Sequence, residues 1–305
     1  MLLFFCPSVT VINGGIRNIF RMAESLRAAG HDARMFEAEG RRPGWFPSTI
    51  PIEGQDIFQP RADQVLVLPE DQPHILAQFK DWPQKKAIYT QNHFYGALGI
   101  GDAQSYADYG VSHLICASRT ILEHAQNRHP SIPCHLVPCG IDRALFKPAA
   151  FKANRIAFMP RKRAIEAVYI RDMFRFTHSE YRDWQWQELS GKSEAEVAQA
   201  LGEAKVFLSL SRLEGFGLAP LEAMAAGCVV AGFTGIGGRE YATEGNGFWA
   251  AEDDFPACVD GLAKAVALAD MPHDAYDKAC DATLAVYAPG IFKQAVAEAW
   301  TKILA

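Results

Sequence analysis

The sequence lacks several features that mark common classes of protein. Its 305 residues contain seven cysteines but no Cys-x-x-Cys and no Asp-x-Asp. Because the cysteines are scattered and odd in number, we expect reduced thiols in a reducing compartment, and neither a disulfide framework nor a metal site. No apolar run reaches the length of a transmembrane helix. The net charge of −5, without a dense basic stripe, argues against nucleic acid as a partner.

The N-terminus resembles a signal peptide only superficially. Met1–Cys6 is apolar, but it is short, has no basic leader and runs directly into Pro7. A buried first strand is the better interpretation, and the expected location is the cytoplasm. Peripheral contact with the inner membrane face stays open, because arginines on and beyond the first predicted helix either face solvent or approach anionic lipid. They are Arg17, Arg21, Arg27, Arg41 and Arg42.

The first half of the chain alternates strand-like and helix-like segments. Strands are predicted at 2–6, 65–68, 87–90, 113–116 and 135–137, and helices at 16–29, 73–81 and 119–127. Such alternation favours a parallel sheet with helices on both faces. Residues 40–60, rich in Pro and Gly and without a clear period, are predicted to form a long loop.

A second α/β series follows a weakly patterned stretch at 142–153, which we interpret as a linker. Strands are predicted at 155–159, 185–189, 206–210 and 228–231, with helices from 164, over 194–203, after the 206–210 strand, over 256–269 and over the last fifteen residues. We therefore expect an α/β protein with one domain at 1–148, a second at 149–288, and a separate C-terminal helix at 289–305.

The segment Glu214–Gly227 is the most informative part of the chain. It places Glu214 and Glu222 around a Gly-Phe-Gly turn, and Pro220 suits the first position of a helix. We predict Glu214 in a strand-to-helix loop and Glu222 in the first turn of that helix. Backbone N–H groups at a helix start favour an anion, and carboxylates accept hydrogen bonds from sugar or ribose hydroxyls.

This Glu-x7-Glu pattern, with Gly-Phe-Gly after the first Glu, resembles the retaining nucleotide-sugar glycosyltransferases of family 4. The resemblance implies the GT-B fold, in which two Rossmann-like domains with parallel sheets face each other across a cleft. It also implies that the final helix, here 289–305, often crosses back onto the first domain. By the same resemblance Glu222 binds the nucleotide ribose and Glu214 meets hydroxyls of the transferred sugar. The backbone amides of Phe216, Gly217 and Leu218 would face sugar and phosphate.

Three consecutive cations, Arg161, Lys162 and Arg163, follow the predicted strand 155–159. Such a cluster suits a diphosphate leaving group, although charge runs are usually solvated turns. The family resemblance implies an Arg and a Lys after this strand, but normally several residues apart. We choose Arg161 and Lys162 as the phosphate ligands and keep Arg163 in reserve.

Two further positions in the first half are candidates for the site. Gly14 and Gly15 precede the first predicted helix, where a backbone can approach a ligand closely. In the family, the glycine-pair loop lies across the cleft from the donor diphosphate. His93 follows a predicted strand, and the family often carries a His there that contacts the donor sugar near the reacting carbon. Gly237 and Gly238 match the family as well, but we interpret them as structural turns.

The predicted function is glycosyl transfer with retention of configuration, without a metal ion or another cofactor. The resemblance implies a UDP- or GDP-linked sugar as donor and a glycan, lipid-linked or small-molecule acceptor. A non-catalytic sugar-nucleotide-binding protein of the same fold is the alternative. A nucleotide-sugar epimerase is disfavoured, because such enzymes lack Gly-Phe-Gly between the two Glu residues.

Overall fold

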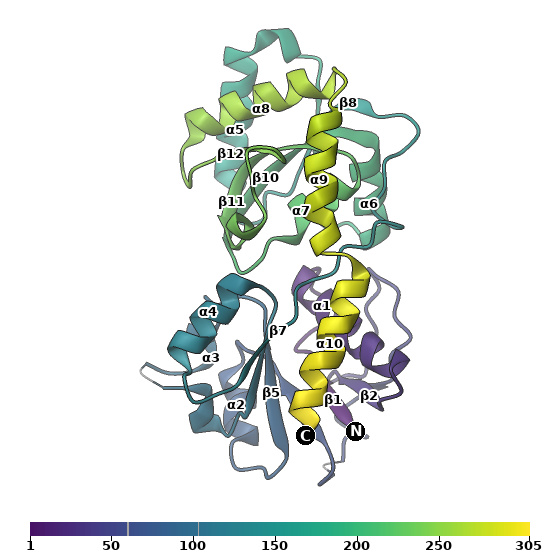
Figure 1. The fold of residues 1–305 in the computed structure, drawn as a ribbon, viewed down its shortest axis with the longest axis vertical. Helices are drawn as coiled ribbons and strands as arrows, with labels where there is room; N and C mark the ends of the chain where they lie inside the picture. Colours follow the sequence, from purple (N-terminus) through teal and green to yellow (C-terminus); the bar gives the residue numbers. More distant parts are fainter. Residues whose placement is uncertain (60, 103) are drawn as a thin grey trace. The chain divides into compact units, whose positions relative to one another are not determined.

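The computed structural model describes residues 1–59, 61–102 and 104–305, which divide into two compact units (Figure 1). Unit 1 contains Met1–Cys139 together with Gly290–Ala305, and unit 2 contains Gly140–Pro289. The division precedes the expected boundary at 148, and the expected linker at 142–153 is part of unit 2. The end of the chain returns to unit 1.

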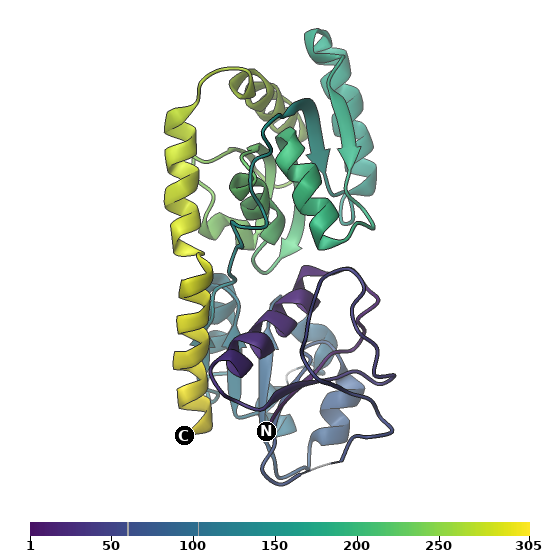
Figure 2. The same ribbon diagram turned by 90° about the vertical axis from the view of Figure 1, so that its right-hand side faces the viewer.

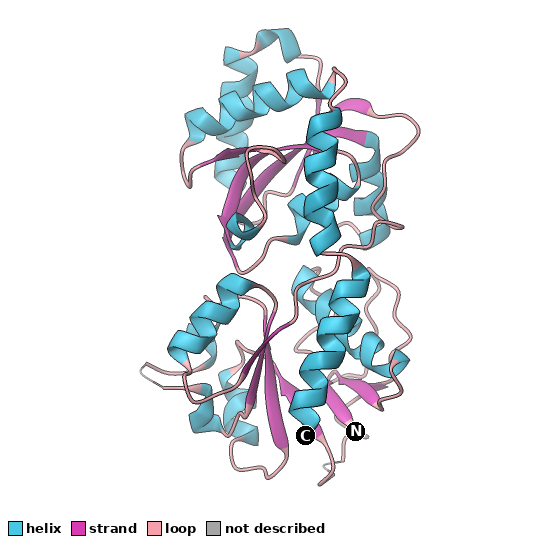
Figure 3. Ribbon diagram, in the orientation of Figure 1, coloured by secondary structure: helices cyan, strands magenta, loops and turns pink. Residues whose placement is uncertain are grey.

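Unit 1 is built on a seven-stranded parallel sheet in the order β3-β2-β1-β4-β5-β6-β7 (Figure 3). Its strands are β1 (Leu2–Phe5), β2 (Ala33–Phe36), β3 (Ile52–Glu53), β4 (Val65–Leu68), β5 (Lys85–Thr90), β6 (His113–Cys116) and β7 (Cys134–Leu136). The strand order reverses between β1 and β4. In open α/β sheets such a switch point, at the carboxyl ends of the strands, is where ligands bind.

Helices cover both faces of this sheet. They are α1 (Gly14–Ala28), α2 (Pro73–Phe79), α3 (Gly96–Gly99), η1 (Tyr106–Tyr109), α4 (Arg119–Arg128) and α10 (Pro289–Leu304). Figure 2 shows α1 and α10 on the same side of the sheet, with α2 on the other. Trp300 of α10 is fully buried and its ring centroid lies 5.7 Å from that of Phe4. Lys85 Nζ also donates to the Ile303 carbonyl at 2.7 Å, so α10 is an integral part of unit 1.

The region predicted as a loop over 40–60 contains a short strand and is packed against the core. β3 pairs with β2 through Met35 and Ile52, while Phe46 and Ile50 are buried. The prediction of a loop is correct for residues 40–51 and wrong for Ile52 and Glu53, because the pairing of β3 with β2 is non-local. Pro60, at the end of this segment, lies outside the described residues.

Unit 2 is built on a five-stranded parallel sheet in the order β12-β11-β10-β8-β9. Its strands are β8 (Ala153–Phe158), β9 (Gln185–Glu188), β10 (Ala204–Glu214), β11 (Val229–Ile236) and β12 (Phe248–Ala250). The helices are α5 (Ala164–Thr177), η2 (Ser179–Tyr181), α6 (Glu194–Glu203), α7 (Leu218–Ala225), η3 (Gly237–Glu240), α8 (Phe255–Ala269) and α9 (Asp274–Val286). α5 packs beside α8, while α7 packs beside α6 and α9.

β10 and β11 both extend beyond their predicted ends, towards the carboxyl edge of the sheet. The segments that follow β8, β10, β11 and β12 all leave from the carboxyl ends of parallel strands. Among the helices of the described chain, none is long and apolar enough to cross a membrane.

Candidate functional site

A bulge at the end of β10 positions Glu214. Ser211 pairs with Thr234 and Glu214 with Ile236, so β10 has one residue more than β11 in this interval. Leu213 lies within the bulge at φ 49°, a conformation that L-residues other than Asn and Asp rarely adopt. Bulges redirect side chains, and they recur beside active sites. Glu214 is thus the last residue of a strand, and its predicted place in the following loop was wrong.

Lys162 and Glu214 are in direct contact. Lys162 Nζ lies 3.0 Å from Glu214 Oε1 and donates to the Leu213 carbonyl at 3.2 Å. The two side chains are 20% and 25% exposed, so both remain open to solvent at the sheet edge. Arg161 is exposed, whereas the Arg163 side chain is completely buried in ion pairs with Glu252 and Asp253. The three consecutive cations therefore differ in accessibility to solvent, and the guanidinium of Arg163 is already bound by two carboxylates.

The Gly-Phe-Gly turn connects Glu214 to α7. Gly217 is the N-cap of α7 at φ 89°, a region that favours glycine, and its carbonyl accepts a hydrogen bond from Tyr241 Oη at 2.7 Å. The Phe216 side chain is buried, with ring centroids 5.7 Å from Tyr241 and 5.1 Å from Tyr287. The side chain of Phe216 therefore holds the turn in place, and only its backbone is free to serve a ligand.

The α7 helix begins two residues earlier than predicted. Leu218 is its first residue, so Pro220 occupies the third position, and Glu222 lies beyond the first turn, in which no acidic residue is present. Pro220 at this position still removes no helical hydrogen bond, because the first N–H groups of a helix have no intrahelical acceptor. Glu222 is only 5% exposed. A carboxylate at this depth needs polar contacts to offset its desolvation.

Gly237 packs against the backbone of the Gly-Phe-Gly turn. A Cβ at this position would lie 2.4 Å from the Gly215 carbonyl and 2.5 Å from the Phe216 nitrogen. The preceding Ile236 adopts φ 76°. The two turns therefore touch backbone to backbone, and only glycine permits this approach. The sequence favoured a structural turn at Gly237 over an approach to a ligand, and this packing agrees with that interpretation.

Tyr241 is a component of the site that sequence reasoning missed. Burial raises its pKa well above the ordinary value, and the carboxylates of Glu214 and Glu222 are among the neighbours that raise it further. The phenol therefore stays protonated and donates to Gly217. No local pattern identified Tyr241, because its role depends on the fold bringing η3 against the Gly-Phe-Gly turn.

The candidate residues of unit 1 gather at the carboxyl ends of β1, β4 and β5. Asn13 caps α1 by accepting from the Gly15 nitrogen at 2.8 Å, and Gln91 Nε2 donates to the Gly15 carbonyl at 3.0 Å. Gly14 and Gly15 are the first two residues of α1, not of the preceding loop. The buried Glu70 accepts from the backbone nitrogens of Gln91 and Asn92 at 3.0–3.1 Å. Glu70 and Gln91 thus brace the segment that carries His93, and sequence reasoning identified neither.

His93 is half-buried beside Phe94 and His124, with ring centroids at 4.1 and 5.2 Å. Burial lowers the pKa of His93, and His124 lowers it further, so the imidazole is neutral near pH 7. Its Nδ1 is buried and has no hydrogen-bond partner within the described residues. Thus His93, Gly14 and Gly15 belong to unit 1, and the remaining predicted site residues belong to unit 2.

Comparison with known proteins finds a family model that matches part of the chain. The model of the family described as glycosyl transferases group 1 matches residues 185–281, which include Glu214, Glu222 and Gly237 but not the cations at 161–163. The chain is 28% identical over 223 residues to the alpha-1,6-glucosyltransferase of Actinobacillus pleuropneumoniae serotype 7 (strain AP76). That alignment covers 71% of this chain and 65% of the relative's own length.

Solved structures extend the likeness to nearly the whole chain. Sucrose-phosphate synthase from Thermosynechococcus elongatus superposes with a TM-score of 0.70 at 15% identity, covering 99% of this chain and 98% of that one. Anabaena HepE, solved in complex with UDP, superposes with a TM-score of 0.64 at 12% identity, covering 99% of both chains. These likenesses, with the two parallel sheets, confirm the predicted GT-B fold of two Rossmann-like α/β domains.

Proposed function

We propose that this chain is a glycosyltransferase that moves a sugar from a nucleoside diphosphate sugar to a hydroxyl acceptor. The observation that carries the proposal is the contact between Lys162 and Glu214 beside the Gly-Phe-Gly turn, with Gly237 packed against that turn. This arrangement places a cation, a carboxylate and the start of a helix at one sheet edge. Together they suit a ligand that carries both phosphate and hydroxyl groups. The family match over 185–281 and the UDP bound to Anabaena HepE support the same ligand class.

In this proposal the donor binds to Lys162 and Glu214, which contact each other in the ligand-free protein. The two side chains are 20% and 25% exposed. An ion pair that is open to solvent contributes roughly 0–1 kcal/mol, so a doubly charged diphosphate competes effectively for Lys162. Lys162 and the exposed Arg161 then neutralise the diphosphate. Glu214 becomes available to accept a hydrogen bond from a sugar hydroxyl, while Glu222 binds the ribose. The backbone amides of Phe216, Gly217 and Leu218 face sugar and phosphate.

The chemical step breaks the bond between the anomeric carbon and the phosphate oxygen and forms a bond from that carbon to the acceptor oxygen. We place the reaction in the retaining class of family 4, with the acceptor entering on the face that the phosphate leaves. The acceptor proton passes to the departing diphosphate, which removes the need for a strong general base. Positive charge at Arg161 and Lys162 lowers the barrier by stabilising the leaving group, so we propose that no metal ion is required. His93, kept neutral by burial, is proposed to contact the transferred sugar.

The donor is proposed to be UDP- or GDP-linked, and the acceptor a glycan, a lipid-linked saccharide or a small molecule. Unit 1 is proposed to receive the acceptor, with Gly14 and Gly15 facing the donor diphosphate. Peripheral contact with a membrane, suggested by the arginines of α1 and of 41–42, is part of this proposal only for a lipid-linked acceptor.

A thermal-shift screen of ADP, GDP, UDP and their glucose conjugates identifies the donor, because a ligand that binds only the folded state stabilises it. At a ligand concentration of 100 Kd the gain is about 2.7 kcal/mol. Transfer or donor hydrolysis by the pure protein then distinguishes an enzyme from a non-catalytic binder. A protein that binds a sugar nucleotide but neither transfers nor hydrolyses it would support the non-catalytic alternative.

Substitution of the two contacting residues tests the site itself. Glu214→Ala and Lys162→Ala should each lower kcat/KM about 100-fold, as loss of a single charge-stabilising group does elsewhere. Lys205→Ala is the matched control, because Lys205 is 24% exposed and pairs with Asp270 at 2.6 Å in the same unit. Near-normal turnover of both site variants would refute the assignment.

A further inference from the structure

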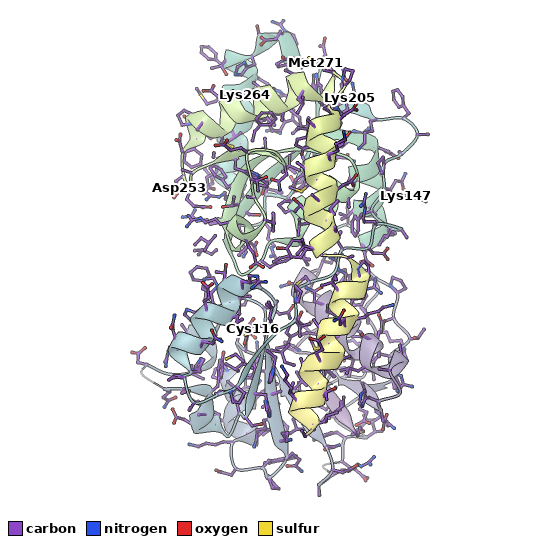
Figure 4. The ribbon with its side chains drawn as sticks, viewed as in Figure 1. Cys116, Lys147, Lys205, Asp253, Lys264 and Met271 are labelled. Atoms are coloured by element: carbon purple, nitrogen blue, oxygen red, sulfur yellow. The ribbon has the colours of Figure 1, made fainter. Side chains whose placement is uncertain are left out.

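The completely buried side chain of Arg163 connects its own turn to three other segments of unit 2. Its Nη2 lies 2.6 Å from Glu252 Oε2, and its Nη1 lies 2.6 Å from Asp253 Oδ1. Its Nε donates to the Ser211 carbonyl at 3.3 Å, and its guanidinium carbon lies 4.3 Å from the centroid of the Phe233 ring. The partners come from β10, β11 and the loop between β12 and α8, where Figure 4 labels Asp253.

The partners of Arg163 are themselves fastened to the sheet. Glu252 accepts a second hydrogen bond from the Gly235 nitrogen at 3.0 Å, which ties it to β11. Asp253 adopts φ 63°, a left-handed conformation that Asp adopts more often than most residues do. Since the guanidinium is enclosed by these acceptors, it has no surface left for a phosphate.

The backbone of Arg163 closes the turn that carries the other two cations. The Arg163 nitrogen donates to the Pro160 carbonyl at 2.8 Å, and the Arg163 carbonyl accepts from Ala167 in the first turn of α5 at 2.8 Å. Neighbouring side chains of this turn reach the same strand, since Arg163 contacts the carbonyl of Ser211 and Lys162 that of Leu213. Fixing Arg163 therefore fixes the main chain from which Lys162 reaches Glu214.

We infer that Arg163 is a positioning residue that holds Arg161 and Lys162 in place for the donor diphosphate. The identity of the ligand in this inference rests on the proposed function. The anchoring of the turn by Arg163 is a property of the ligand-free protein and does not depend on it. The three adjacent cations thus differ in role, because Arg161 and Lys162 face the ligand while Arg163 anchors the turn that carries them. A short basic turn needs such an anchor, because the adjacent positive charges of Arg161 and Lys162 repel each other and solvent-exposed ion pairs contribute little stability.

The test uses Arg163→Met, which keeps the length of the side chain but removes its charge and donors. Arg163→Lys and Asp253→Asn are weaker perturbations, and Asp253, whose side chain is 57% exposed, can be changed with little risk to folding. Arg155→Met is the matched control, because Arg155 lies in β8, the strand that precedes the turn, and pairs with Glu203 at 3.3 Å, away from the turn.

Two measurements separate positioning from general stability. Amide hydrogen exchange of the free protein should become at least about tenfold faster at Arg163 and Ala167 in Arg163→Met, with β9 and α9 unchanged. Calorimetric titration with UDP, GDP and ADP and the matching monophosphates should show the diphosphate weakened about tenfold and the monophosphate much less. Arg163→Lys should recover part of the diphosphate affinity, and Asp253→Asn should lower it in the same direction by a smaller factor.

Unchanged exchange in the turn, equal weakening of diphosphate and monophosphate, or the same result in Arg155→Met would overturn the inference. If Arg163→Met does not fold, Asp253→Asn and Arg163→Lys decide by the same criteria. If the unmodified protein binds no nucleoside diphosphate, the proposed function fails, and the exchange measurement alone decides whether Arg163 anchors the turn.

Discussion

The contact between Gly237 and the Gly-Phe-Gly turn yields a sharp prediction for Gly237→Ala. The added Cβ would lie 2.4 Å from both the carbonyl carbon and the carbonyl oxygen of Gly215, and 2.5 Å from the Phe216 nitrogen. All three are backbone atoms, so no flexible side chain can move aside. Ordinary contact requires about 3.5 Å between such atoms, so one of the two turns must shift by roughly 1 Å.

The size of this shift determines the expected effect. Overpacking of this kind destabilises a protein by about 1–3 kcal/mol, which lowers the melting temperature of a domain of this size by roughly 2–12 °C. A displacement of about 1 Å in a site can also cost about 100-fold in rate. We therefore expect Gly237→Ala to lose about 100-fold in kcat/KM, beyond what its modest loss of stability explains.

The assay combines thermal denaturation with transfer kinetics at a temperature where both proteins are folded. Gly245→Ala is the control, because its added Cβ would come no closer than 3.3 Å to Ala279 Cβ. Turnover and melting temperature in Gly237→Ala equal to those of the unmodified protein would show that the two turns are not in tight contact. The reasoning from their geometry to the donor site would then be refuted.

Two further predictions concern stability. Trp300→Ala, which removes the fully buried ring of α10 packed on Phe4, should lower the free energy of unfolding by about 3–5 kcal/mol in urea, whereas exposed Thr301→Ala should change it little. Acidification should destabilise unit 1, because burial lowers the pKa of five of its histidines, that of His129 to about 4, and these outnumber the buried Glu70, whose raised pKa acts in the opposite sense. These histidines are His93, His113, His124, His129 and His135. Since the unfolded chain takes up these protons near pH 6.5 and the folded chain does not, stability is complete above pH 6.5 and falls as the pH drops towards 4. Urea unfolding at pH 7.5 and 5.0 checks the sign, and a free energy of unfolding that does not fall would contradict it.

Much of the fold follows from local patterns. The alternation of apolar runs and amphipathic segments predicted a parallel α/β sheet in each half, and the strands Val65–Leu68 and His113–Cys116 have the predicted bounds. β2, β3 and β12 were missed; β3 and β12 are only two and three residues long and depend on pairing with neighbouring strands. The α9 helix was missed as well.

The candidate site shows the same division. The Glu-x7-Glu spacing and the Gly-Phe-Gly turn are local, so they predicted a strand, a turn and a helix around two carboxylates. The bulge at Leu213 was not predictable, because it arises where β10 carries one residue more than β11. The brace formed by Glu70 beneath Gln91 and Asn92 joins two strands and leaves no pattern in the sequence.

The sequence by itself determined the class of fold and the segment proposed to bind phosphate and hydroxyl groups, because both depend on periodicity and on spacing within a few residues. Only the tertiary structure decided which of three adjacent cations is buried and which remain open to solvent. Arg161, Lys162 and Arg163 are chemically similar in sequence, and their roles differ because Ser211, Glu252 and Asp253 enclose one of them while Glu214 meets another at the open edge. Burial and the arrangement of acceptors, not residue type, separate the anchor from the candidate phosphate ligands.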